Sequence, residues 1–546
     1  MMLKLVDVFG YLSVILRAGT LIFQSLLLGG VLFVLWIARP TSEIANSNFA
    51  KVQTSSLRML RIAAIGLAVV QALYLYVNSA VLMATAEIGM RDVIGANFFI
   101  SGSVVFVAAI ATAALARLGS KPAGIWLALL VMVVLGASVM TNHAASRMEG
   151  RVPLIILSLL HELATGFWIG GLPFLVLGLF VSGDRPTQWY LTKRFSSLAL
   201  VSVGVIVATG IGMSLYYIGS WRSLYGTSYG VMVAAKAVML GALMALGGIN
   251  FLLLRKCSPD AVMPRLRRLV EAEVGIGITV ILTAASVTSQ PPAVDLVNDT
   301  VTAQQVWSRV KPAWPRLGIE ALAQSSASTP DRDAAQADSV PKLPPTSVNG
   351  APLTPKNLAD IEESELNHHW MGLLVLVMGV LALLARTGKA KWAEYWPLLL
   401  IGIAVFIIVR ADTEAWPLGP QGFWATCLRP EDLQHRLAAL VCIGFAVFEL
   451  RVRKLKLENH PAALVFPLMC ALGGALLLTH SHNLSNIKEE LLAELSHVPL
   501  GILAVLAGWS RWLEVRLPAR DRGIPAWIWP MCFALIGAGL LNYREI

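Results

Sequence analysis

Apolar runs alternate with short polar stretches along most of the chain. The runs are about 20 residues long, which is the length that an α-helix needs to cross the hydrocarbon core of a bilayer. Backbone polar groups inside lipid must be satisfied within the spanning structure, so such runs form either helices or the strands of a closed barrel. Barrel strands alternate hydrophobic and polar positions, whereas these runs are continuously apolar. The pattern therefore predicts an all-α, polytopic integral membrane protein.

The apolar runs predict about 14 transmembrane helices in an 8 + 6 arrangement. They lie at roughly 9–37, 57–84, 94–117, 121–142, 152–181, 194–219, 229–255 and 265–288, and then at 367–386, 392–410, 433–452, 462–481, 489–513 and 524–542. The stretch between the two sets is rich in Ala, Ser, Pro, Asp and Gln and cannot bury much apolar area. We therefore expect an eight-helix membrane domain over 1–290, a largely disordered linker over 291–366 and a six-helix, His-rich membrane domain over 367–546. A short piece around Trp307–Trp314 is expected on the membrane surface.

The charged residues indicate how the helices are oriented. Only 14% of the 546 residues are charged while 56% are hydrophobic, and the formal net charge is +10. The positive charge lies in short loops and not on one face of a soluble module, so we do not expect nucleic acid as a partner. Every second predicted loop is basic, as the positive-inside rule requires of cytoplasmic loops. Both termini and the linker are then predicted to lie outside the cytoplasm.

Histidine and methionine are the candidate metal ligands. On this topology eight of the nine histidines fall in the outer half of the membrane. Neutral imidazole is the commonest protein ligand for metals, and thioether sulfur favours Cu(I). The alternative is structural, because a histidine at a helix end often only caps the helix and methionine is common in membrane helices. The candidates are His143, His161, His368, His369, His435, His480, His482, His497, Met140 and Met371. Five scattered cysteines without a CxxC motif predict neither disulfides nor a thiolate metal site.

Several charged residues lie inside the predicted spans, where charge is costly and often functional. Glu162 is the clearest case, and pairing with Arg17 or Lys236 is as good an explanation for it as a role in transport. Glu271 and Glu273 lie in the eighth span. The sequence has no GxxxxGK[ST] phosphate loop and no soluble domain that could bind nucleotide. We therefore expect neither an enzyme nor an ATP-driven pump.

The first half resembles the copper-resistance D (CopD) membrane protein family over residues of about 140 to 293. The resemblance is carried by an ordered set of short motifs, namely Asn142-His143-Ala144-Ala145, His161-Glu162-Leu163-Ala164, Trp168-Ile169-Gly170-Gly171-Leu172, Arg194-Phe195-Ser196, Leu198-Ala199-Leu200, Thr209-Gly210, Tyr229-Gly230, Lys236, Asn250, Glu273 and Thr288-Ser289-Gln290-Pro291-Pro292-Ala293. It implies a role in copper handling, with His143 and His161 as copper contacts and a periplasmic copper-binding protein as a partner. The second half is only loosely similar to His-rich domains of copper-resistance fusions, and a tandem copy of the first half is not indicated.

These observations together predict copper transport at the inner membrane, with uptake of Cu(I) or Cu(II) from the periplasmic side and a contribution to copper homeostasis or resistance. In the second half we expect His435, His480 or His482, and His497 to bind the ion, with His368 or His369 at its entry. Two alternatives stay open. Histidines on facing helices can also ligate haem, which would make the protein a membrane electron carrier. Ligands confined to the outer half would equally suit an assembly factor that delivers copper to a membrane oxidase.

Overall fold

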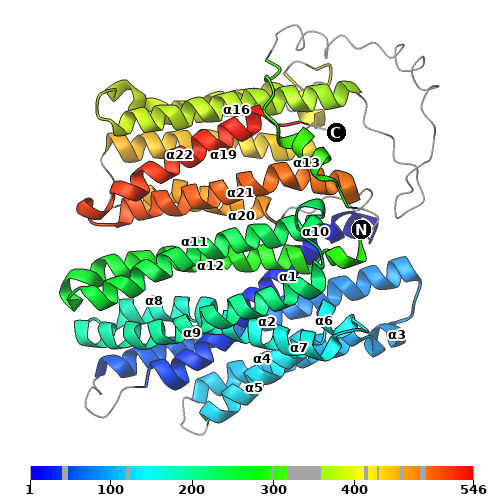
Figure 1. Ribbon diagram of the computed structural model, residues 1–546, viewed down its shortest axis with the longest axis vertical. Coiled ribbons are helices and arrows are strands. Elements are labelled where there is room, and N and C mark those ends of the chain that lie inside the picture. The colour runs from blue at the N-terminus through cyan, green and yellow to red at the C-terminus, as the bar shows by residue number, and fades with distance from the viewer. Residues whose placement is uncertain are drawn as a thin grey trace. The chain divides into compact units, whose positions relative to one another are not determined.

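The computed structural model describes residues 2–39, 47–118, 123–296, 300–317, 358–410, 416–417, 419–426, 430–455, 457, 460–479 and 487–544. These residues form helices and no β-strand element (Figure 1). By its internal contacts the chain divides into two compact units. Unit 1 comprises Met1–Thr300 with Leu478–Ser481, and unit 2 comprises Val301–Leu477 with His482–Ile546.

Unit 1 is a bundle of long helices joined by short turns. Its elements are α1 (Met2–Leu32) with the π-helix η1 (Phe33–Ile37), α2 (Ser47–Ala86), α3 (Met90–Gly95), α4 (Asn97–Leu118), α5 (Ala123–Val139), α6 (His143–Ser146), α7 (Arg151–Thr165) with the π-helix η2 (Gly166–Gly170), α8 (Leu172–Val181), α9 (Arg185–Tyr217), α10 (Trp221–Gly226), α11 (Ser228–Lys256), α12 (Pro259–Thr288) and η3 (Ala293–Asp295). Polar caps mark where helices begin. Asp184 accepts a hydrogen bond from the backbone N–H of Thr187 at the start of α9, and Thr227 accepts one from Gly230 at the start of α11.

Unit 2 contains the helices of the second half. Its elements are α13 (Ala303–Val310), α16 (Leu358–Arg386), η4 (Lys391–Leu398), α17 (Leu399–Arg410), α18 (Phe423–Thr426), α19 (Pro430–Lys454), η5 (Pro461–Leu464), α20 (Val465–Leu477), α21 (Ile487–Arg516), η6 (Ala519–Asp521) and α22 (Gly523–Leu541). Helices α16 and α22 pack closely because glycines face backbone across the interface. A Cβ on Gly537 would lie 2.2 Å from the backbone nitrogen of Leu376.

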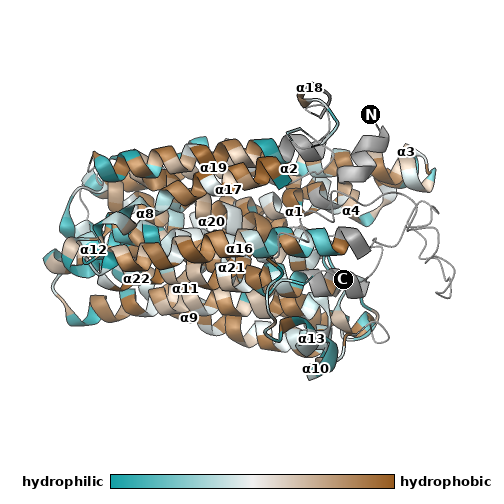
Figure 2. Ribbon diagram, turned by 90° about the horizontal axis from the view of Figure 1, so that it is seen from above, coloured by the Kyte–Doolittle hydropathy of each residue, from teal (hydrophilic) through white to brown (hydrophobic). Residues whose placement is uncertain are grey.

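The helices agree with the predicted all-α membrane architecture. Within the described residues, eleven helices are long and apolar enough to cross a membrane, and Gly124–Val139 and Pro461–Leu477 are shorter apolar helices. Helix α19 covers the remaining expected span but is not among either group. Hydrophobic residues run along the helices and hydrophilic residues gather at their ends (Figure 2). The chain is therefore a multi-pass helical membrane protein, whereas the count of fourteen spans stays a prediction.

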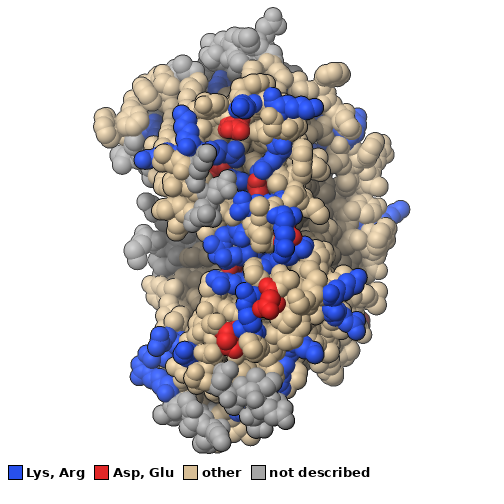
Figure 3. Space-filling view, turned by 90° about the vertical axis from the view of Figure 1, so that its left-hand side faces the viewer, with Lys and Arg blue, Asp and Glu red and all other residues tan. Residues whose placement is uncertain are grey.

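Within each unit, the basic turns lie at one end of the helices. In unit 1 the α8–α9 and α11–α12 turns lie at the end opposite α3, α6 and α10 (Figure 1). In unit 2 the α16–η4 turn lies at the end opposite α13 and the C-terminus (Figure 1). Taken unit by unit, Figure 3 shows Lys and Arg side chains at the helix ends where these turns lie. The alternation of basic loops in the sequence thus corresponds to a physical separation within each unit.

Part of the expected linker is ordered, and disorder in the rest of it stays a prediction. Residues 300–317 include α13, which begins with a capping box between Thr302 and Gln305. Asn542 anchors this helix at its C-terminal end, because its amide donates to Val310 O at 3.0 Å and its Oδ1 accepts from Ala313 N at 2.9 Å. Residues 318–357 lie outside the described part of the chain, as do 297–299. Trp307 and Trp314 are exposed, as expected of a segment on a membrane surface, although that location stays a prediction.

Candidate functional site

His143 lies at the end of unit 1 that is opposite the basic turns. It is the first residue of α6, and its ring centroid lies 6.5 Å from that of Tyr217 on α9. Its Nε2 is buried and has no hydrogen-bond partner among the residues that the structure describes. Burial lowers the pKa of His143, and the nearby cations Arg17 and Arg147 lower it further, against a backbone hydrogen bond to Thr288 and the charge of Asp295. A lowered pKa keeps the ring neutral at ordinary pH, and neutral imidazole is the form that binds metal.

Glu162 stands at the centre of a polar network inside the helix bundle. Its Oε1 accepts from the Asn142 amide at 2.6 Å, and its Oε2 accepts from the Gln24 amide at 2.8 Å. The Asn142 Oδ1 in turn accepts from Arg17. Asn142 therefore connects two charged groups, the Glu162 carboxylate on α7 and the Arg17 guanidinium on α1.

Lys236 on α11 adds a second cation to this network. It interacts electrostatically with both Glu162 and His161. Two cations therefore face one carboxylate, so the network disfavours a further bare cation bound at Glu162 itself. The donors in this region that suit a soft metal ion are the imidazoles and not the carboxylate.

His161 is oriented by Thr209 on α9. Its Nδ1 lies 2.9 Å from Thr209 Oγ1, and that hydroxyl lies 2.6 Å from the carbonyl oxygen of Val205. A hydroxyl has one proton to donate, so the short contact to Val205 indicates that Thr209 accepts a hydrogen bond from His161 Nδ1–H. The ring is then in the tautomer that leaves the lone pair on Nε2, and a metal-binding histidine is held in just this way by a partner at its other nitrogen.

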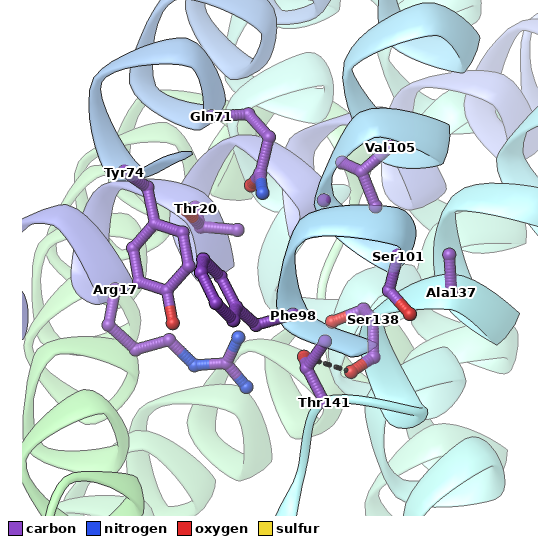
Figure 4. A pocket seen from close by; sticks show the side chains of 11 residues that line it. Arg17, Thr20, Gln71, Tyr74, Phe98, Ser101, Val105, Ala137, Ser138 and Thr141 are labelled. Carbon is purple, nitrogen blue, oxygen red and sulfur yellow. Dashed lines mark hydrogen bonds between the residues drawn. The ribbon is translucent and has the colours of Figure 1, made fainter. Parts of the chain in front are cut away.

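A small polar cavity lies beside this network, among α1, α2, α4 and α5. In Figure 4 Arg17, Tyr74 and Phe98 lie on one side of it, and Ser101, Ser138 and Thr141 lie on the other. It has space for about one water molecule. The guanidinium of Arg17 therefore lies between a hydratable cavity and the carboxylate network.

Three of the second-half histidines gather around Tyr543 in unit 2. The His368 ring stacks on the Tyr543 ring with centroids 3.8 Å apart, and its Nδ1 lies 2.7 Å from Ser364 O. The His497 ring lies 6.3 Å from the Tyr543 ring. His369 is buried, its Nε2 lies 2.9 Å from Tyr543 O, and its Nδ1 accepts from Arg316 N at 2.9 Å. Because the lone-pair nitrogen of His369, Nδ1, already accepts from a backbone N–H, metal binding there would require breaking that hydrogen bond.

The remaining predicted ligands are not gathered into a metal site in the described parts of the chain. His435 is exposed on α19, and Met371 packs against the apolar core of unit 2. Met140 lies in the turn after α5, where its carbonyl accepts from the Asn97 amide. His480 and His482 lie outside the described residues. Among the residues described, no group of three or more His, Cys, Asp or Glu side chains is placed to hold a metal ion.

Some residues that contact the candidate histidines and Glu162 could not have been identified from the sequence. Tyr543 follows the last apolar run, and nothing in its local pattern signals contact with three histidines. Gln24 and Thr209 are single polar residues inside apolar runs, which is a weak signal in a membrane helix. The motif Asn142-His143 pointed to this region through its histidine, whereas in the structure Asn142 makes the connections to both charges.

The comparisons with known proteins match part of the chain. Residues 190–287 match the family described as "Copper resistance protein D". The "Copper transport protein CutJ" of Bacillus subtilis (strain 168) is 36% identical over 173 residues, which is 31% of each protein. No solved structure matches the chain. The resemblance to the CopD family is thus confirmed, and the chain spans about a third of the length of the curated relative that it matches.

The family match contains some of the predicted residues and not others. Thr209, Lys236, Asn250 and Glu273 lie within 190–287, whereas the two histidines that the resemblance implied as copper contacts precede it. Assignment of His143 and His161 to copper therefore depends on the geometry described above.

Proposed function

Because residues 190–287 match the CopD family, we propose that this chain transports copper across the inner membrane, with uptake from the periplasmic side. The observation that supports this best is the coupling of two imidazoles to a charged network inside the unit that carries the family segment. Polar and charged groups within spans are unfavourable in lipid, so their presence there calls for a function. The curated relative is itself a copper transport protein by its printed name.

The proposed entry of copper is at His143. This ring lies at the end of unit 1 that is opposite the basic turns, and its Nε2 is available to a ligand. His161 lies farther along the membrane, on α7, with its Nε2 as the lone-pair nitrogen. Copper would pass from one imidazole to the other, while Glu162 offsets part of the charge that Arg17 and Lys236 bring to this region. In the second unit, His368 and His497 are proposed as a further outer binding point.

Removal of both imidazoles in unit 1 should abolish copper uptake. The double variant His143→Ala with His161→Ala is expected to lower copper accumulation about 10-fold or more, since even the partners of metal ligands typically contribute 10- to 100-fold to affinity. Copper per cell, measured by mass spectrometry in cells that express equal amounts of folded protein, gives the result. The control is His460→Asn, because His460 is exposed and caps η5, and asparagine keeps that cap. Equal uptake by the double variant and the wild type would remove both histidines from the pathway.

The orientation of the chain is a separate prediction. Reporter fusions should place Gln188, Asp260 and Glu458 in the cytoplasm, and Ser220, Gln336 and Ile546 in the periplasm. The reason is the positive-inside rule applied to the basic turns, which lie at one end of each unit. A cytoplasmic signal at Gln336 would contradict the periplasmic position of the histidines.

The two alternatives predict different observations. A haem-binding electron carrier would show a haem absorption spectrum after purification, whereas a copper transporter would bind added Cu(I) without one. An assembly factor for an oxidase would lower oxidase activity when deleted, without changing cytoplasmic copper. A fall in cytoplasmic copper on deletion supports uptake.

A further inference from the structure

A second carboxyl group lies inside unit 1, separate from the Glu162 network. Glu273 is halfway along α12 and only 3% exposed, and its Oε1 accepts a hydrogen bond from the Asn250 amide on α11. Asn250 follows Lys236 by 14 residues on α11, which is about 21 Å along the helix. The pair Glu273–Asn250 therefore lies at a deeper level than the outer network of Arg17, Glu162 and Lys236.

No cation pairs with Glu273 among the residues that the structure describes. Its neighbour on α11 is the uncharged Asn250, and its Oε2 faces Gly247, where a Cβ would lie 4.0 Å away. The buried Trp168 of η2 lies 3.7 Å from the same Cβ position. The ionisable residue of α12 nearest to Glu273 in the sequence is Glu271, which pairs with Arg268 at 2.5 Å and with Arg267 at 3.8 Å. An isolated carboxylate buried in this way is strongly unfavourable, so the group carries a proton or a counter-ion.

The hydrogen bonding of Asn250 favours a proton over a counter-ion at Glu273. Its Nδ2 donates to Glu273, but its Oδ1 is buried and has no hydrogen-bond partner in the described residues. A protonated carboxyl has one O–H donor in addition to its acceptor oxygen. An acid and an amide can therefore satisfy each other, with Asn250 N–H donating to one oxygen of Glu273 and the Glu273 O–H donating to Asn250 Oδ1. Loss of the proton would leave both a buried charge and an unpaired amide oxygen.

We propose that Glu273, paired with Asn250, carries the proton that moves across the membrane in each cycle of copper transport. This inference rests on the proposed transport function. The step breaks one carboxyl O–H bond and leaves a carboxylate, and the proton passes to water on one side of the membrane, with no change of oxidation state. Reprotonation of the same oxygen restores the pair, so each cycle exchanges one proton at this position. Asn250 positions the carboxyl and stabilises its protonated form.

The experiment uses the full chain in liposomes that contain a pH-sensitive dye. Copper is added outside, as Cu(I) with a reductant and in parallel as Cu(II), and both the copper taken up and the internal pH are followed. The wild type should change the internal pH in proportion to the copper taken up, and the sign of the change gives the direction of the proton. Its uptake should also depend on an imposed pH gradient.

The variant Glu273→Gln tests the residue itself. Glutamine keeps the shape and the hydrogen-bonding of the protonated acid but cannot release a proton, so copper-dependent pH change should be lost while copper binding by the purified protein stays. The matched control is Glu271→Gln, which removes a carboxylate two residues away on the same helix and should keep the pH change. Glu273→Asp keeps an ionisable group and should retain part of the pH change. This variant tests the residue if Glu273→Gln is poorly folded.

Three results would overturn the inference. Wild-type liposomes that take up copper without any pH change would refute proton coupling and leave copper transport standing. Coupled pH change that persists in Glu273→Gln would assign the proton to another group. Wild-type liposomes that take up no copper would refute the transport function and this inference with it.

Discussion

Replacing Glu449 by alanine should unfold unit 2 or leave it with a much lower melting temperature. Glu449 on α19 is 1% exposed and accepts from Arg453 Nε at 3.0 Å and from Arg511 Nη2 at 2.9 Å. Arg511 also bridges to Glu514 on its own helix, at 2.7 Å. Breaking a buried pair by removing one partner typically costs about 3–5 kcal/mol, because the other charge is left without compensation. Here two arginines would lose the same carboxylate.

The cluster around Glu449 connects four helices, so its loss should destabilise the whole of unit 2. Glu514 on α21 pairs with Arg386 of α16 and accepts from Trp529 Nε1 of α22 at 2.6 Å. The guanidinium of Arg511 lies 5.4 Å from the centre of the Trp529 ring. Ion pairs, a hydrogen bond and a cation–π contact therefore all hold this one buried cluster together.

Thermal unfolding of the detergent-solubilised protein, followed by size exclusion, measures this effect. Glu362→Ala is the comparison, because Glu362 is exposed and pairs with the half-exposed Arg316 at 3.2 Å. Exposed ion pairs of this kind contribute about 0–1 kcal/mol. A melting temperature for Glu449→Ala equal to that of Glu362→Ala would show that the buried cluster does not hold the four helices together.

The second large effect is expected from Gly170→Ala in unit 1. A Cβ on Gly170 would lie 1.8 Å from the backbone oxygen of Ser25 on α1, and a backbone atom cannot turn aside as a side chain can. Helix α1 and the π-helix η2 would have to move apart, and overpacking of this kind typically costs about 1–3 kcal/mol. The shift would also move Gln24, next to Ser25, away from Glu162, so that copper transport should fall along with stability.

Gly204→Ala on α9 is the matched control, because nothing lies within 4 Å of a Cβ at that position. Alanine there should be neutral or stabilising by up to about 1 kcal/mol, since glycine is the weaker helix former. The two variants make the same chemical change and differ only in what the new methyl group meets. If both had the same unfolding temperature and the same copper uptake, the close approach of α1 and η2 would not matter for either property.

The helices themselves could be predicted from the sequence alone. Long apolar runs must satisfy their backbone hydrogen bonds internally, so every expected span overlaps a helix of the structure. The ordered part of the presumed linker could not be predicted in this way. Its helix α13 is held by Asn542, which lies 232 residues away from Val310 in the sequence, and composition carries no information about such a contact.

The residues of the candidate site were only partly predictable. Residue type and depth identified Glu162, Lys236 and the outer histidines, because charge and imidazole are conspicuous in apolar runs. Whether an imidazole is free to bind metal depends on what each of its nitrogens meets. His369 meets two backbone groups, from Arg316 and Tyr543, whereas His143 keeps an unpaired Nε2 among the residues described. That difference arises from segments far apart in the sequence, and so only the tertiary structure decides it.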